Sequence, residues 1–392
     1  MIHRLLPWLF VLVSTPVVAM SEDAAVSAAL VNPDVEIMLA AQADAAAGRA
    51  DAVGRWANPE VEYVRESLDG FNGDSDDHFL VVRQRWNPAG ARGLERAAAE
   101  EALDAERTRI EYRRREIVAA VRSAFHDVLA ARGRLEAVSS FRRRLSALVD
   151  VVSARADAGE ASEFDALRLR RSLAVADGDL SRAEAVHAAA ELRLASLTAT
   201  DAVVTGELMP PEAVVSDEVA TDPRASALAA EGRAATLRAR AAEREAWPDL
   251  TLGVGVRRFD QAGQQAEGGV VSIGIELPVF DRARGRRDAA RAEAIANDAE
   301  RRILERRLEA DADAATTRLA AERRAAARLA DSSADADRLA RIAEAAHAAG
   351  EVDVLALIDA HESALDSKLR SLDHARAARA AYIQLQTLGR VP

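Results

Sequence analysis

Hydrophobic residues along the chain follow two different periods, and the shorter period predicts strands. Between residues 250 and 257, apolar side chains alternate with small or polar ones, and residues 271–277 repeat this alternation. Residues 61–63 and 79–86 show a less regular version of the same pattern. Alternation places one kind of side chain on each face of a strand. We therefore expect two β-hairpins, of which the second has a purely aliphatic face that is typical of membrane-facing sheets.

The longer period predicts helices of unusual length. Residues 92–156 contain no proline, and their apolar residues recur at three-, four- and seven-residue steps. Residues 284–348 give a helix of the same length. Shorter helices are expected before each β-hairpin and after each long helix, at 33–55, 163–199, 223–245 and 352–388. Placed end to end, the two short helices of each half nearly match the long one, so each half is expected to form one coiled helical hairpin.

The chain also repeats itself. Landmarks of the first half recur in the same order and at a nearly constant offset in the second half: Pro33 and Pro223, Pro59 and Pro248, Pro88 and Pro278, Gly159 and Gly350. We therefore expect a first structural repeat at 20–199 and a second at 222–392. Each has the order helix, β-hairpin, long helix, tip, helix. The linker at 200–221 contains two adjacent prolines and lacks periodicity.

The first residues have the pattern of a secretory signal peptide. His3 and Arg4 precede the apolar stretch 5–13, and small residues occupy the −3 and −1 positions of a cleavage site after Ala19. We expect residues 1–19 to be removed by Sec-type processing, with an uncleaved N-terminal anchor as the alternative. No later apolar run reaches the length of a membrane-spanning helix. If the mature chain crosses a membrane, it must therefore do so with strands.

The amino-acid composition argues against several classes of function. The absence of cysteine excludes disulfides, thiolate metal ligands, cysteine nucleophiles and an N-terminal lipid-modified cysteine. A formal net charge of −12 argues against nucleic acid as a partner. Aromatic residues are only 4% of the chain, and alanine supplies much of the hydrophobic content, so a large aromatic-lined pocket is not expected.

The remaining polar chemistry is sparse. The spacing of His347, His361 and His374 does not place them on one helix face, so we expect structural or solvated histidines. The segment Asp74–His78 is expected to be a flexible, solvated loop, with a bound divalent cation as the alternative. No Ser/His/Asp or paired-carboxylate set can be placed in one pocket. We therefore expect no enzyme, no cofactor and no metal site.

These features together resemble the outer membrane efflux protein family, the TolC-like channels. The most specific local pieces are Ala349–Ala360, with the sequence AGEVDVLALIDA, and the hairpin flanks Ala57–Val61 and Trp247–Leu250. Residues 82–92, which lead into the first long helix, are similar to the heavy-metal cation efflux branch. The resemblance implies a mainly α fold in which long coiled helical hairpins form a periplasmic α-barrel. It also implies four β-strands per chain and a trimer that closes a twelve-stranded transmembrane β-barrel.

Barrel physics agrees with a trimer. An open sheet edge in lipid leaves backbone groups unpaired, and four strands cannot close a barrel. Two chains would give eight strands, a barrel that is normally filled by its own side chains, whereas three chains give a barrel with a lumen.

The resemblance implies an outer-membrane channel of a tripartite efflux system in a Gram-negative bacterium. Such a channel passively conducts substrates from an inner-membrane pump and a periplasmic adaptor to the exterior. The implied partners are a homotrimer, a periplasmic adaptor protein, an inner-membrane transporter of RND type and outer membrane lipid. The cargo, which in this family is selected by the pump, is not readable from the sequence.

Two other classes remain open. A periplasmic adaptor, or membrane fusion protein, would carry one helical hairpin between two halves of a lipoyl-like domain, whereas this chain predicts two hairpins. A structural coiled-coil protein would explain the helices but would leave the alternating strands without a role.

The expected functional residues lie at the two predicted tips. Gly159 and Gly350 permit the chain reversal. The apolar residues expected at the tip, where the resemblance places adaptor docking, are Phe164, Leu167, Val354, Leu355 and Leu357, with ordinary coiled-coil core as the alternative. The acids expected at a pore constriction are Asp165, Asp353 and Asp359, with solvated surface acids as the alternative. An arginine and an aspartate that the family often carries near the second tip are replaced by Val352 and Ala356.

Overall fold

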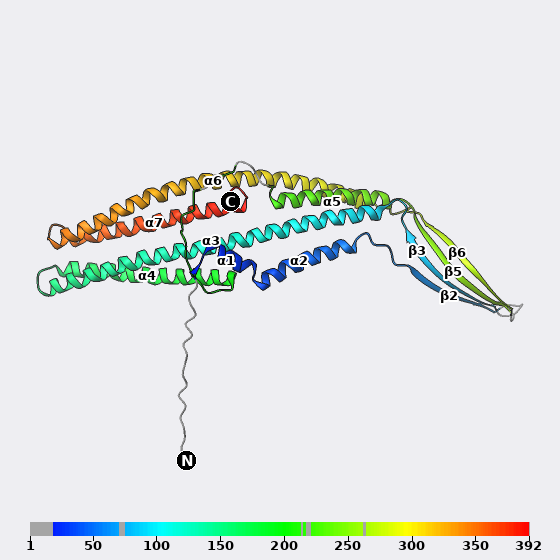
Figure 1. Ribbon diagram of the computed structural model, residues 1–392, viewed down its shortest axis with the longest axis horizontal. Coiled ribbons are helices and arrows are strands. Elements are labelled where there is room, and N and C mark those ends of the chain that lie inside the picture. The colour runs from blue at the N-terminus through cyan, green and yellow to red at the C-terminus, as the bar shows by residue number, and fades with distance from the viewer. Residues whose placement is uncertain (1–18, 70–74, 213–214, 217–220, 262–263, 392) are drawn as a thin grey trace, which may run out of the picture. The chain divides into compact units, whose positions relative to one another are not determined.

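The computed structural model describes residues 19–69, 75–212, 215–216, 221–261 and 264–391 (Figure 1). Residues 1–18 of the predicted signal peptide therefore lie outside the described residues. In chain order the elements are β1 (Ala19–Met20), α1 (Glu22–Leu30), α2 (Pro33–Ala52), β2 (Glu60–Leu68), β3 (Ser75–Trp86), α3 (Ala91–Asp157), α4 (Glu163–Thr198), β4 (Val203–Val204), α5 (Pro223–Glu245), β5 (Asp249–Gln261), β6 (Gln264–Glu276), α6 (Arg284–Ala348) and α7 (Val354–Thr387).

These elements form two compact units. The helical unit consists of Met1–Glu36, Arg114–Ala220 and Ala310–Pro392, and the sheet unit consists of Ile37–Arg113 and Thr221–Glu309. Each unit contains segments from both predicted repeats. The boundaries of the compact units therefore do not coincide with the boundaries of the predicted repeats. The division into two repeats stays a prediction.

The predicted long helices and four predicted strands are confirmed. Helices α3 and α6 contain 67 and 65 residues, and the short helices end within a few residues of their expected positions. Strands β5 and β6 are longer than expected, with 13 residues each. They extend beyond the alternating segments because some of the residues between these segments also pair in register, for example Asp260 with Gln265.

The expected flexible loop before β3 was wrong for residues 75–78; Asp74 lies outside the described residues. These four residues belong to β3 and pair with β2 and β5. Side chains reinforce the pairing. Arg65 donates to Asp76 at 2.8 Å, the Tyr63 hydroxyl lies 2.8 Å from His78 Nδ1, and Arg257 Nε donates to Asp77 Oδ1 at 3.0 Å. Cross-strand arginines therefore pair with Asp76 and Asp77, the two acids of this segment that the structure describes.

The sheet unit contains one antiparallel sheet with the strand order β2-β3-β5-β6. Its register aligns one valine of every strand in a single row: Val61, Val82, Val254 and Val271. On the opposite face, Val81 is buried over Gly253 and Gly255. A side chain at Gly255 would overlap the carbonyl oxygen of Leu80, so only glycine fits this close approach. Within the described residues, β2 and β6 each have one edge without a strand partner.

The helical unit is built on two antiparallel helical hairpins, α3 with α4 and α6 with α7 (Figure 1). Near the two tips, Leu145 and Leu169 of the first hairpin pack in one core with Val354 and Ile358 of the second. A second core joins Phe125 of α3 to Met20, the last residue of β1. The parallel pair β1–β4 fixes the first described residues against the segment that follows α4.

No single described helix has both the length and the apolar composition that a bilayer crossing requires, and the bent pair of α1 and α2 meets that requirement only jointly.

Candidate functional site

The two tips use the same backbone motif. Gly159 and Gly350 have φ values of +76° and +77°, the left-handed region that favours glycine. After each glycine the next N–H donates back across the turn, from Glu160 to Arg155 O at 2.7 Å and from Glu351 to Ala346 O at 2.8 Å. These bonds satisfy carbonyls at the end of the long helix. The chain therefore reverses at Gly159 and Gly350, where the sequence predicts it.

The structure separates the five apolar tip residues into two groups. Phe164, Leu167 and Leu355 are exposed, with relative accessibilities of 68%, 55% and 45%. Val354 and Leu357 are buried, at 3% and 0%. Val354 belongs to the core that joins the two hairpins. Only the three exposed residues offer a surface to a partner, and the two buried ones support the tips from inside.

The three tip acids differ in their surroundings. Asp353 is the N-cap of α7, and its carboxylate accepts the Ala356 N–H at 2.8 Å. Asp165 lies half-buried in the first turn of α4, and Asp359 is exposed on α7. Neither of these two carboxylates has a hydrogen bond or ion pair within the described part of the chain. Asp353 therefore has a structural role, whereas Asp165 and Asp359 are available for other interactions.

The helical unit contains a buried polar cluster that no local sequence pattern indicates. Glu22 of α1 accepts His126 Nε2 at 2.9 Å and lies 3.1 Å from Arg122 Nε. Arg379 of α7, only 6% exposed, reaches to within 4.0 Å of the same carboxylate. The cluster therefore connects the first helix to both hairpins.

Arg379 also holds the predicted linker. Its guanidinium donates to three successive carbonyl oxygens, those of Glu207 at 3.0 Å, Leu208 at 3.0 Å and Met209 at 2.8 Å. The segment after β4 is thus fixed against the helical unit by buried hydrogen bonds. The sequence contained one signal of this role, because Arg379 interrupts the otherwise apolar buried stripe of α7 that contains Ala375, Ala378, Tyr382 and Leu385.

Buried histidines make the helical unit sensitive to acid. Burial lowers the pKa of His126 and of His361, whose Nε2 lies 3.1 Å from Glu344. The hydrogen bond from His126 lowers the pKa of Glu22. All three shifts mean that the unfolded chain binds protons at a higher pH than the folded chain does, so folding stability is lost as pH falls.

We therefore expect the helix unfolding temperature to fall when the pH is lowered from 7 to 5. The free energy of unfolding begins to fall near the ordinary histidine pKa of about 6.5. It falls by at most about 1.4 kcal/mol per pH unit for each histidine. Circular dichroism of the detergent-extracted protein measures the effect. His126→Gln and His361→Gln should each flatten the pH profile, and a wild-type profile that is flat over this range would contradict the assignment.

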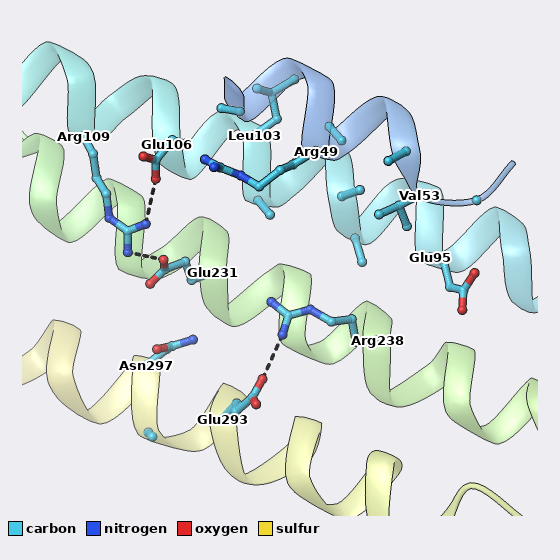
Figure 2. Close-up of a pocket in the computed structure, with 18 residues that line it drawn as sticks. Arg49, Val53, Glu95, Leu103, Glu106, Arg109, Glu231, Arg238, Glu293 and Asn297 are labelled. Atoms are coloured by element: carbon cyan, nitrogen blue, oxygen red, sulfur yellow. Dashed lines mark hydrogen bonds and ion pairs between the residues drawn. The ribbon is translucent and has the colours of Figure 1, made fainter. Parts of the chain in front are cut away.

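The sheet unit contains a cavity of about 920 Å³ among α2, α3, α5 and α6 (Figure 2). Arg109 of α3 reaches Glu106 at 3.1 Å and also contacts Glu231 of α5, and Arg238 bonds Glu293 of α6 at 2.8 Å. Alanines form most of the remaining lining. No group of three potential metal ligands occurs among the described residues. The cavity thus contains ion pairs that link neighbouring helices.

In the half of the sheet nearer the helices, the two faces have opposite character. One face presents exposed aliphatic side chains, for example Val254 at 63% and Val271 at 79%. The other face carries cross-strand ion pairs, Arg83 with Glu62 and Arg85 with Asp249 at 3.8 Å. At the helix-proximal ends of the four strands lie four exposed aromatic residues, Trp56, Trp86, Trp247 and Phe280.

No protein-family model and no curated protein matches this sequence. Its fold does match solved structures. A membrane protein from Pseudomonas aeruginosa has a TM-score of 0.80 and 16% identity, over 94% of this chain and 93% of that chain. The outer-membrane channel OprN has a TM-score of 0.78 and 18% identity, over 94% and 90%. The Campylobacter jejuni CmeC outer membrane channel has a TM-score of 0.81 and 11% identity, over 94% and 85%. The chain therefore has the fold of these membrane proteins, mainly helical with two long helical hairpins and one four-stranded sheet.

Proposed function

We propose that the chain is the outer-membrane channel of a tripartite efflux system, with a large periplasmic portion. The observation that carries this proposal is the sheet itself. In the half nearer the helices, all four strands expose apolar side chains on this face, and an apolar patch of this kind marks a surface that meets lipid or another protein. The aromatic residues at the strand ends correspond to the girdles that flank the apolar band of membrane barrels. In this proposal lipid contacts the aliphatic face and water solvates the charged face, so each face has a suitable solvent.

The open edges of β2 and β6 support a homotrimer. Unpaired backbone groups are not tolerated in hydrocarbon, so each edge needs a strand from another chain. Three copies of four strands give a closed barrel with a lumen, in which the charged face lines water. The similar solved structures supply the fold of one chain, and the trimer is part of the proposal.

The mature protein is accordingly expected in the outer membrane fraction, as a trimer after extraction in detergent. Native mass spectrometry gives its stoichiometry, and planar bilayer recordings are expected to show ion conduction. A monodisperse soluble monomer without conductance would end the channel hypothesis. A periplasmic adaptor, the main alternative, would carry one helical hairpin where the described residues form two.

In this proposal the tips meet the hairpin of a periplasmic adaptor, and the adaptor connects the channel to an inner-membrane transporter of RND type. Phe164, Leu167 and Leu355 supply the exposed apolar surface for this contact. A place in the heavy-metal branch stays a prediction, because the similar solved structures are only 11–18% identical to this chain and support the fold alone.

Asp165 and Asp359 are proposed to line the constriction of the closed trimer. Three copies of each carboxylate around one axis would attract cations, because several charges act together in a narrow passage. Asp353 contributes less, since its carboxylate caps α7. With valine at position 352, hydrophobic tip contacts are proposed to hold the closed state.

Asp359→Asn is expected to lower cation selectivity and to weaken block by multivalent cations added from the periplasmic side. Reversal potentials and block measured in planar bilayers test this. Asp313→Asn, an exposed acid far from the tip in α6, removes the same charge and should behave as wild type. If the Asp359 variant matches wild type in both measurements, Asp359 does not line the constriction, even if the protein conducts.

A further inference from the structure

The aromatic residues where the sheet meets the helices share their surface with several arginines, and together they indicate a lipid-binding role. We name these residues the junction surface: Trp56, Trp86, Trp247, Phe280, Arg55, Arg92, Arg282 and Arg284. We propose that the junction surface binds the headgroups of anionic phospholipids in the leaflet nearest the helices. This inference rests on the proposed membrane insertion of the sheet and adds to it the class of lipid that is bound.

The aromatic side chains locate the surface at a membrane boundary. The sequence has four tryptophans, and one of them, Trp8, belongs to the predicted signal peptide. The other three all lie at helix-proximal strand ends: Trp56 before β2, Trp86 at the end of β3 and Trp247 before β5. The fourth strand, β6, is followed by the fully exposed Phe280 instead of a tryptophan. Amphipathic aromatic rings prefer the headgroup level of a bilayer.

The arginines of the junction surface differ from most arginines of the sheet unit, because they have no carboxylate partner within the described residues. Arg92 lies over the ring of Trp56, with its guanidinium carbon 3.3 Å from the ring centroid. Arg55 donates only to the backbone oxygen of Asp51. Arg282 and Arg284 are exposed on either side of the buried Ala283. An unpaired guanidinium can bind a phosphate through two parallel hydrogen bonds.

A cavity at the same place has room for a headgroup. Its volume is about 600 Å³, and its lining includes Arg55, Arg92, Trp247 and Phe280. Acids also line it, but arginines balance several of them: Arg85 lies 3.8 Å from Asp249 and from Glu276, and Arg286 lies 3.0 Å from Glu245 and 3.5 Å from Asp281. Burial raises the pKa of Glu95, and its hydrogen bond with Glu245 acts in the same direction, which reduces the charge that would repel a phosphate.

The position of the tryptophans provides a direct experiment. The full mature protein is reconstituted in phosphatidylcholine vesicles that contain equal mole fractions of either brominated phosphatidylglycerol or brominated phosphatidylcholine. Bromine quenches tryptophan fluorescence at short range, and all three tryptophans report on the junction surface. We expect stronger quenching by the anionic lipid, and high salt should weaken the difference.

The double variant Arg282→Gln/Arg284→Gln should lose the preference for phosphatidylglycerol, by about fivefold for each arginine removed. The matched control is Arg182→Gln/Arg328→Gln, two exposed arginines of the helical unit that also have no carboxylate partner among the described residues. This control should keep the wild-type preference.

Two results would overturn the inference while leaving the channel proposal intact: equal quenching of wild type by both lipids, or an unchanged preference in the Arg282/Arg284 variant. The absence of quenching by either lipid would instead contradict membrane insertion, and with it both proposals.

Discussion

Arg379→Met is expected to destabilise the helical unit by about 3–5 kcal/mol, the usual cost of removing one partner from a buried charged contact. The substitution leaves three carbonyl oxygens of the segment 207–209 without their donor. It also removes a cation from the surroundings of the buried Glu22–His126 pair. We expect a lower unfolding temperature by circular dichroism and faster proteolysis within residues 200–216.

Arg376→Met is the matched control, one turn earlier on the same helix. Arg376 is exposed and bonds Asp127 at 2.8 Å, so its removal should cost no more than about 1 kcal/mol. If the two variants unfold at the same temperature and are cleaved at the same rate, Arg379 does not hold the linker.

Gly350→Val is expected to abolish efflux while trimers still accumulate in the outer membrane. The φ of +77° at Gly350 is unfavourable for any other residue by roughly 1–2 kcal/mol, and a β-branched side chain fits it least well. The space that a Cβ atom would occupy at this glycine is open, with no atom of a non-adjacent residue within 4 Å. The cost therefore arises from the backbone, and the tip must change its conformation to relieve it. Efflux and trimer yield are measured in the same cells.

Gly178→Val provides the comparison for this tip variant. Gly178 lies within α4, its surroundings are equally open, and valine has a higher helix propensity than glycine. This variant should keep normal efflux. Normal efflux from Gly350→Val with a normal amount of trimer would show that the geometry of the second tip is not required.

The sequence predicted those parts of the fold that repeat over many residues. The apolar steps of residues 92–156 and the alternation at 250–257 extend over enough positions to identify helix and strand without tertiary information. The left-handed tip glycines were predictable for a related reason, because a single residue type relieves a backbone restriction at the end of a long helix. Features that depend on contacts between distant segments of the chain were harder to predict from the sequence.

Three particular residues illustrate this limit. Arg379 bonds carbonyls about 170 positions away along the chain, and a contact with backbone atoms leaves no pattern in the partner sequence. Val354 and Leu355 are adjacent and both apolar, yet one is buried and the other exposed. The packing of the second hairpin against the first decides between them, and neither local periodicity nor residue type contains that information.

The short strand β1 lies at the predicted cleavage site and so bears on the order of maturation. The predicted cleavage site joins Ala19 to Met20, and these two residues pair with Val203 and Val204. Met20 is buried in a core that also contains Phe125. A peptidase needs its substrate as a free extended segment. Once β1 has paired with β4, the bond between Ala19 and Met20 is therefore less accessible to a peptidase. If the leader is cleaved after Ala19, as the sequence predicts, cleavage would therefore have to precede the pairing of these residues with β4.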